Sequence, residues 1–102
     1  MFRYFVTKEG DKYEAGFKQN GVTMSALITP VGELVETESD TSPTKLPAAV
    51  RATLARDYKA YKVTEAAVLV LASGATTYEV EVGQVGKHYD VVFNADGSLV
   101  KK

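Results

Sequence analysis

Two stretches of this chain repeat one another without a gap, and this internal repeat constrains the fold more than any other feature. Residues 13–35 lie over residues 78–100 at a constant offset of 78 − 13 = 65. Hairpin turns need a positive φ, which glycine reaches without a Cβ clash, and two glycine pairs fall at such turns. These pairs are Gly21/Gly86 and Gly32/Gly97. The repeat therefore predicts two related units.

Apolar and polar residues alternate inside each unit, as in Tyr13-Glu14-Ala15 and Tyr78-Glu79-Val80. A period of two over short runs is typical of half-buried antiparallel strands. Asn20-Gly21 and the segment 94–97 have the composition of tight turns. We expect two four-stranded meanders, the first over residues 2–8, 12–19, 22–29 and 33–38, and the second over residues 62–72, 76–83, 87–94 and 98–101.

A turn-rich linker, residues 41–47, separates the two units and leads into a predicted helix from Pro47 to Tyr58. Proline is favoured at the first helical position. Apolar residues recur every four positions, which indicates a stripe that packs on a sheet: Leu46, Val50, Leu54 and Tyr58. The fold class is α+β, a single domain over residues 1–102, with strands only in 1–40 and a helix plus strands in 41–102.

The first unit has no helix before it, so part of one sheet face is left uncovered. Apolar faces of that size are uncommon on monomers. An upstream helix, a shared helix or a dimer would each bury the face, and we expect self-association. The uncovered residues are Phe2, Tyr4, Phe17, Met24 and Ile28.

Composition excludes several classes of function. The chain of 102 residues has 12 basic and 13 acidic side chains, whereas a nucleic-acid binder normally carries a basic excess. Zero cysteines exclude thiolate chemistry, and a single histidine excludes multi-histidine metal centres. No apolar run approaches the roughly 18 residues of a membrane span, so we expect no membrane insertion. The N-terminus lacks the pattern of a signal peptide.

Four stretches of the sequence together resemble one family: KEGDKYEAGFKQNG, GELVETE, LPAAVRATLARDYKAYKVTEA and TTYEVEVGQVGKHYDVVFNADGSLVK. They are similar to the PepSY-like, beta-lactamase-inhibitor-like proteins of Bacteroidetes. The resemblance implies tandem helix-plus-four-strand repeats, like those of the beta-lactamase inhibitory protein, and a periplasmic or secreted location. This chain departs from the pattern by lacking the helix of the first repeat. The resemblance implies no catalytic residue.

Two candidate sites involve the only histidine and the aromatic residues near the helix end. His88 shares a strand face with Asp90, and such a pair can orient an imidazole for base catalysis. No nucleophile motif accompanies the pair, so we interpret His88 as a surface residue. Tyr58 and Tyr61, with neighbouring lysines, have the composition of a nucleic-acid stacking patch. The net charge argues against that interpretation, and Tyr58 falls on the apolar stripe of the helix, so we predict helix packing and a helix-to-strand turn.

Two further candidates consist of oxygen-bearing side chains. Asn94, Asp96 and Ser98 alternate around Gly97 at a spacing that can hold Ca²⁺. The distal acidic ligands of a calcium loop are missing, so we favour a plain Asp-Gly turn without metal. An acidic stretch, Glu33, Glu36, Glu38 and Asp40, is predicted to be a solvated edge strand whose charges discourage aggregation.

These observations predict a non-enzymatic binding or inhibitory module without a cofactor. The sheet face opposite the helix is polar and suits contact with an unidentified protein. Its predicted residues are Glu14, Lys18, Thr23, Ser25, Glu79, Glu81, His88 and Asp90. The alternative function is a structural or regulatory domain that acts through homodimerisation.

Overall fold

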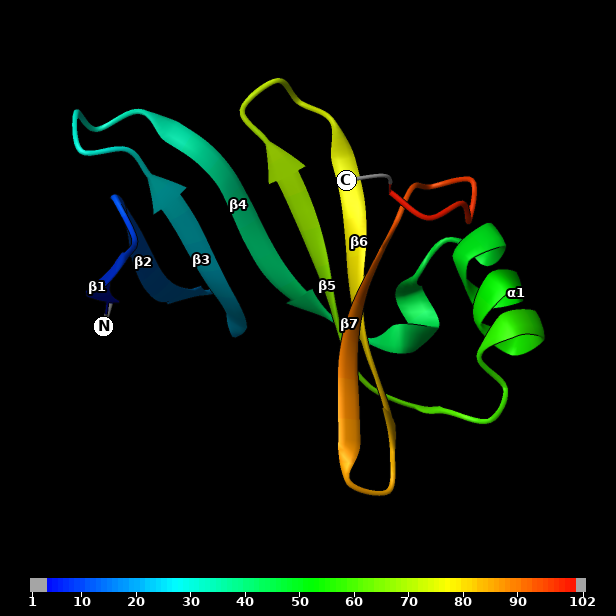
Figure 1. Cartoon of the computed structure of the whole chain (residues 1–102). Helices are drawn as coiled ribbons and strands as arrows, with labels where there is room; N and C mark the ends of the chain where they lie inside the picture. Colours follow the sequence, from blue (N-terminus) through cyan, green and yellow to red (C-terminus); the bar gives the residue numbers. More distant parts are fainter. Residues whose placement is uncertain (1–3, 101–102) are drawn as a thin grey trace.

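All the strands form one antiparallel sheet whose order in space follows the chain, from β1 to β7 (Figure 1). The computed structural model describes residues 4–100. The first four strands are β1 (Tyr4–Glu9), β2 (Lys12–Gln19), β3 (Val22–Ile28) and β4 (Leu34–Thr41). The last three are β5 (Lys62–Leu71), β6 (Thr76–Gln84) and β7 (Lys87–Phe93). This architecture confirms the α+β meander.

The hairpin turns have the backbone geometry that the sequence predicts. Asn20 and Gly21 both have positive φ angles, 51° and 79°. These values suit a two-residue turn whose twist matches that of the flanking strands. Gly32 and Gly97, which share a place in the sequence repeat, both have a φ of 87°. Two turns separated by 65 residues in the sequence therefore share one conformation at this glycine.

The only α-helix in the described part of the chain, α1, runs from Ala48 to Asp57 after a short 3₁₀ turn, Pro43–Lys45. It is one residue shorter at each end than predicted, and Pro47 is its N-cap. Leu46, Val50 and Leu54 form a buried core with four sheet residues, Ala66, Val80, Val82 and Phe93. The predicted apolar stripe therefore packs on the second half of the sheet. Within residues 4–100, no helix has the length and apolar character needed to cross a membrane.

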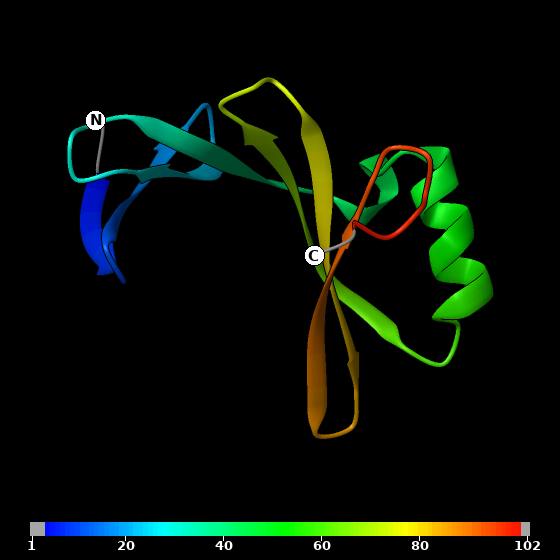
Figure 2. The same ribbon diagram turned by 45° about the horizontal axis from the view of Figure 1, so that its top comes forward.

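Helix α1 lies beside β5, β6 and β7, whereas β1 to β3 lie far from it (Figures 1 and 2). Val82 and Phe93, on the face under the helix, are fully buried. Their counterparts at the offset of 65 are Phe17 and Ile28, which are only half-buried. Phe2 lies outside the described residues, and for Tyr4 the structure gives only its backbone pairing with Phe17.

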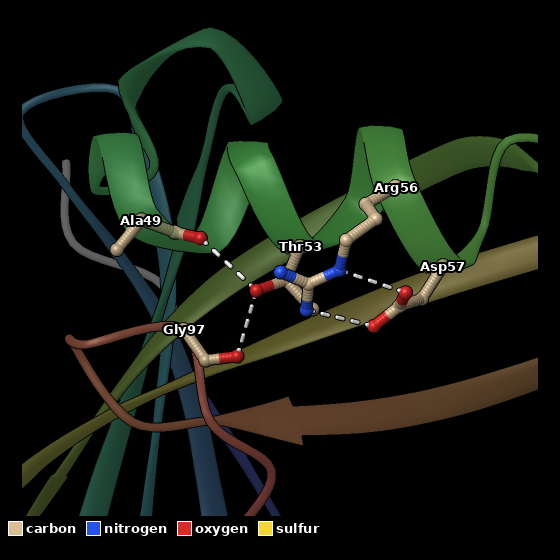
Figure 3. Close-up of polar contacts among 5 residues, drawn as sticks. All are labelled: Ala49, Thr53, Arg56, Asp57 and Gly97. Carbon is tan, nitrogen blue, oxygen red and sulfur yellow. Dashed lines mark hydrogen bonds and ion pairs between the residues drawn. The ribbon is translucent and has the colours of Figure 1, made fainter.

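The loop after β7 docks on the helix through a buried hydroxyl group (Figure 3). Thr53 Oγ1 lies 2.9 Å from the Gly97 carbonyl and 3.1 Å from the Ala49 carbonyl, so it can donate to either. A Cβ at Gly97 would lie 2.5 Å from the Ala49 oxygen, so only glycine fits at this contact. The predicted eighth strand, 98–101, is therefore wrong within the described residues. The loop first turns toward the helix at Gly97, and residues 98–100 then stay beside β7 only through the isolated bridge between Phe93 and Leu99, with hydrogen bonds from Asn94 N–H to the Ser98 carbonyl and from Val100 N–H to the Val92 carbonyl.

The prediction that the acidic stretch forms an edge strand is also wrong. Glu36 and Glu38 lie in β4, which pairs with β3 on one side and with β5 on the other. The two predicted meanders join at this point into one continuous sheet, so β4 is its middle strand. It also continues to Thr41, beyond the predicted end at residue 38. Glu33 precedes β4, and its N–H donates to Thr29 Oγ1 in the turn.

Candidate binding face

The strand register separates the sheet into a face under the helix and a face without one, which we call the open face. Side chains alternate along each strand, and residues directly opposite one another on neighbouring strands share a face. Val80 and Val82 lie under the helix, so Glu79 and Glu81 belong to the open face. The register from β2 to β7 brings all the predicted face residues to this side, namely Glu14, Lys18, Thr23, Ser25, Glu79, Glu81, His88 and Asp90.

Sequence reasoning missed the residues at the centre of this face. β4 and β5 lie between the two groups of predicted residues and contribute Glu36, Glu38, Asp40 and Glu65. The centre of the open face is therefore acidic, whereas the sequence predicted mixed charge. The acidic alternation of β4 was visible in the sequence. Its place became clear only once β4 was seen to pair with β5.

Glu38 is the most perturbed carboxyl group of the open face. It lies opposite Ser25 on β3 and opposite Leu69 on β5. Its pKa is raised from 4.5 to about 7, mainly by burial and in addition by the charges of Glu79, Asp40, Glu14 and Glu36. Glu38 therefore carries a proton for part of the time at neutral pH.

Glu79 is the partner of Glu38 across the face. Burial is the main cause that raises the pKa of Glu79, with Asp90 and Glu36 adding to the effect. A side-chain hydrogen bond with Glu38 acts in the opposite direction. Two carboxyl groups can form such a bond only when one of them holds a proton. The two groups therefore titrate as a pair.

Two shallow hollows meet at Glu38. One, of about 40 Å³, is lined by two alanines and by the carboxylates of Glu38, Asp40, Glu65, Glu79, Glu81 and Asp90. The other, of about 80 Å³, is lined by Glu14, Ser25, Leu27, Glu36 and Glu38. Neither hollow is deep enough to enclose a substrate. Two such shallow hollows suit contact with the surface of another molecule better than catalysis in an enclosed pocket.

His88 contacts Glu81, and no contact joins it to Asp90 among the described residues. Its Nδ1 lies 3.7 Å from Glu81 Oε1, the oxygen that also accepts a 2.6 Å hydrogen bond from Thr64 Oγ1. A Cβ at Gly83 would lie 2.7 Å from His88 Nδ1, so the imidazole rests over a glycine of β6. The His88 side chain is 60% exposed. This geometry fits the interpretation of His88 as a surface residue.

The turn considered for Ca²⁺ is held by hydrogen bonds among its own side chains. Ser98 Oγ donates to Asp96 Oδ1 at 2.6 Å, and Asn94 Nδ2 donates to Ser98 Oγ at 3.0 Å. The bonds from Ser98 lower the pKa of Asp96. These contacts account for the turn without a ligand.

The tyrosines near the helix end pack together. Tyr58 makes edge-to-face contacts with Tyr61 and with Phe93, and Tyr61 makes one with Tyr89. Tyr58 and Tyr61 border the core under α1. The prediction of helix packing for these two tyrosines is confirmed.

Comparison of whole architectures finds similar solved structures from Bacteroides. A DUF2874 family protein from Bacteroides uniformis ATCC 8492 matches with a TM-score of 0.87 and 20% identity, over 96% of this chain and 74% of that one. A BLIP-like protein from Bacteroides fragilis NCTC 9343 matches with a TM-score of 0.79 and 24% identity, over 96% and 71%. The fold is BLIP-like.

A further match at a TM-score of 0.88 and 20% identity is a protein from Bacteroides eggerthii DSM 20697. It covers 96% of this chain and 73% of that one, and its name assigns it provisionally to the periplasm. Matches at this identity establish the BLIP-like fold alone. No family model and no curated protein matches the chain.

Proposed function

We propose that this chain is a non-enzymatic binding module that docks a protein on its open face. The observation that carries the proposal is the asymmetry of the sheet. Helix α1 buries one side of β5 to β7, while the polar residues of β2, β3, β6 and β7 converge on the other side. A broad, polar surface is typical of transient protein contacts.

The sequence resemblance and the similar solved structures support a proposal of family and location. We place the chain among the PepSY-like, beta-lactamase-inhibitor-like proteins, with a periplasmic or secreted location. The BLIP-like and provisionally periplasmic names of the structural neighbours support that placement. Fractionation of the source cells, followed by immunoblotting, tests the location. Recovery only in the cytoplasmic fraction would contradict it.

Site-specific photo-crosslinking tests the binding face. A crosslinking residue at Ser25 or Thr77 reports on the open face, and one at Ala52 or Ala55 reports on the exposed side of α1. We expect a partner protein captured only from the open-face positions. Capture of the same proteins from both sets, or from neither, would contradict the proposal.

The purified partner then allows a quantitative test. A variant with Glu79, Glu81 and His88 replaced by alanine removes side chains of the open face and leaves the core residues intact. We expect this variant to bind the partner at least about tenfold more weakly, since interface side chains of β6 and β7 are lost. Unchanged affinity would reject this part of the face.

A second candidate function is self-association through the helix side of β1 to β4. The specific observation is that Phe17 and Ile28 are half-buried where their repeat counterparts Val82 and Phe93 are fully buried. A second copy of the chain would bury this apolar surface. Sedimentation equilibrium tests the idea, and a monomer at micromolar concentration would contradict it.

A further inference from the structure

We propose that the open face selects a protein partner that presents an extended segment rich in lysine or arginine. This inference rests on the binding function proposed above and names the chemistry of the partner. It follows from the unbalanced charge of the face, the absence of internal ion partners at its centre, and the apolar residues set among its carboxylates.

The charge of the open face is strongly unbalanced. Carboxylates come from six different strands, namely Glu9 of β1, Glu14 of β2, Glu36, Glu38 and Asp40 of β4, Glu65 of β5, Glu79 and Glu81 of β6, and Asp90 of β7. The cationic or titratable basic groups of the face lie toward its margins, at Lys12, Lys18, Lys62 and His88. A positively charged partner is the complement of such a surface.

The carboxylates at the centre of the face have no cationic partner within the described residues. The ion pairs among residues 4–100 are Lys12–Asp11, Arg56–Asp57 and His88–Glu81. The Lys12–Asp11 pair lies at the turn between β1 and β2, and the His88–Glu81 pair lies at the hairpin end of β6 and β7, so neither reaches the centre of the open face. Glu38 and Glu79 instead influence one another: the charge of Glu79 raises the pKa of Glu38, and a side-chain hydrogen bond with Glu38 lowers that of Glu79. The repulsion that surrounds this pair is relieved by a retained proton, and a bound cation would relieve it equally well.

Apolar side chains lie between the carboxylates. Leu27 is half-buried opposite Glu14 and Glu36, and Leu69 is half-buried opposite Glu38. Lysine and arginine bury their methylene stems on apolar surface while their charged heads remain solvated. The face therefore offers contacts for the stem as well as for the charge.

The extent of the charge favours a segment over a single ion. Within residues 4–100, no group of three or more acidic or histidine side chains is arranged to hold one metal ion. From β4 to β7 alone the carboxylates extend over three strand spacings, or roughly 14 Å at ~4.8 Å each. An extended segment of about five residues spans that distance. Alternate side chains of such a segment point to the same side and reach different strands.

Binding of cations should displace the proton that Glu38 and Glu79 share. The groups that face Glu38 are Glu14 and Ser25 from β2 and β3, Glu36 and Asp40 from its own strand, Leu69 from β5, and Glu79 from β6. The charged groups among these are all acidic, so within the protein only the shared proton reduces their mutual repulsion. Affinity for a cationic segment should therefore increase as the pH rises through about 7.

The test uses a capped peptide of four Lys-Gly repeats as the cationic probe, with a Gln-Gly peptide of equal length as the neutral control. Calorimetry at pH 7 and low salt, in two buffers of different ionisation enthalpy, gives both the affinity and the number of protons released. We expect the lysine peptide to bind at least about tenfold more tightly than the glutamine peptide. Up to about half a proton should be released per peptide, because the Glu38 pKa is about 7.

Two double variants with the same change in net charge complete the test. Glu38→Gln with Glu79→Gln removes the pair, whereas Glu33→Gln with Asp11→Asn removes two charges in exposed turns. The first should abolish proton release and weaken binding about fivefold, and the second should change affinity less than twofold. Equal binding of both peptides, or equal losses in both variants, would overturn the inference. A crosslinked partner without a cationic segment would overturn it and leave the binding function standing, whereas an open face that captures no protein would refute the binding function itself.

Discussion

Gly97→Ala and Gly32→Ala form a matched pair that isolates the contact between the last loop and helix α1. Both glycines have a φ of 87°, so alanine pays the same backbone strain at each, about 1–2 kcal/mol. The surroundings differ. Nothing lies within 4 Å of a Cβ built on Gly32, whereas a Cβ on Gly97 meets the Ala49 carbonyl oxygen at 2.5 Å and Thr53 Oγ1 at 2.7 Å.

The difference in the free energy of unfolding between the two variants therefore measures the packing and hydrogen bonding of the docked loop, without the backbone strain. To accommodate Gly97→Ala, the loop must move off the helix or the Thr53–Gly97 hydrogen bond must break. Either response adds about 1–3 kcal/mol. We expect a total loss of about 2–5 kcal/mol for Gly97→Ala against about 1–2 kcal/mol for Gly32→Ala. Urea unfolding followed by circular dichroism measures both values. Equal destabilisation of the two variants would refute the docked loop.

Three further predictions concern the same half of the sheet. Thr53→Val should destabilise the fold by about 1–3 kcal/mol by leaving the buried Gly97 carbonyl unpaired, whereas Thr53→Ser should retain most of the stability in the same urea assay. Gly83→Ala should push the His88 ring aside, because the new Cβ would lie 2.7 Å from its Nδ1. Loss of the nuclear Overhauser contacts between the His88 ring protons and the Hα of residue 83 reports this, while the backbone contacts of the pair persist; unchanged ring contacts would contradict it. Because the folded-state pKa of Glu38 is raised from 4.5 to about 7, wild-type stability should fall as the pH rises between these values. Glu38→Gln should reduce this dependence, leaving the part due to Glu79, and stabilise the protein at pH 8 by about 1 kcal/mol, a value reduced for solvent screening, with no gain near pH 4.

The local features of the fold could be predicted from the sequence. The alternation of apolar and polar residues predicted the strands, and the glycines predicted the hairpin turns. The spacing of Val50 and Leu54 predicted which side of the helix packs on the sheet. These features depend on neighbours in the chain, so a short sequence window contains the information. The predicted residues of the open face also fall on one side, because side-chain alternation propagates through each hairpin.

The joining of the two units could not be predicted from local patterns. The pairing of β4 with β5 spans the linker and the helix, so no turn between the two strands specifies it. That pairing moved Glu36 and Glu38 from a presumed edge to the centre of the sheet. Likewise, the 98–101 segment has the alternation of a strand, but the Thr53 hydroxyl draws its start toward the helix. Tertiary contacts decided both outcomes.

The most direct test of the acidic open face as a cation-binding surface is a ¹³C NMR titration of the Glu38 side-chain carboxyl, with and without the lysine peptide. For the free protein, we expect a midpoint near pH 7, caused by burial and by the charges of Glu79 and Asp40. Saturation with the lysine peptide should shift the midpoint to lower pH, and the glutamine peptide should leave it unchanged. A Glu38 midpoint near its ordinary 4.5 that neither peptide moves would contradict the account.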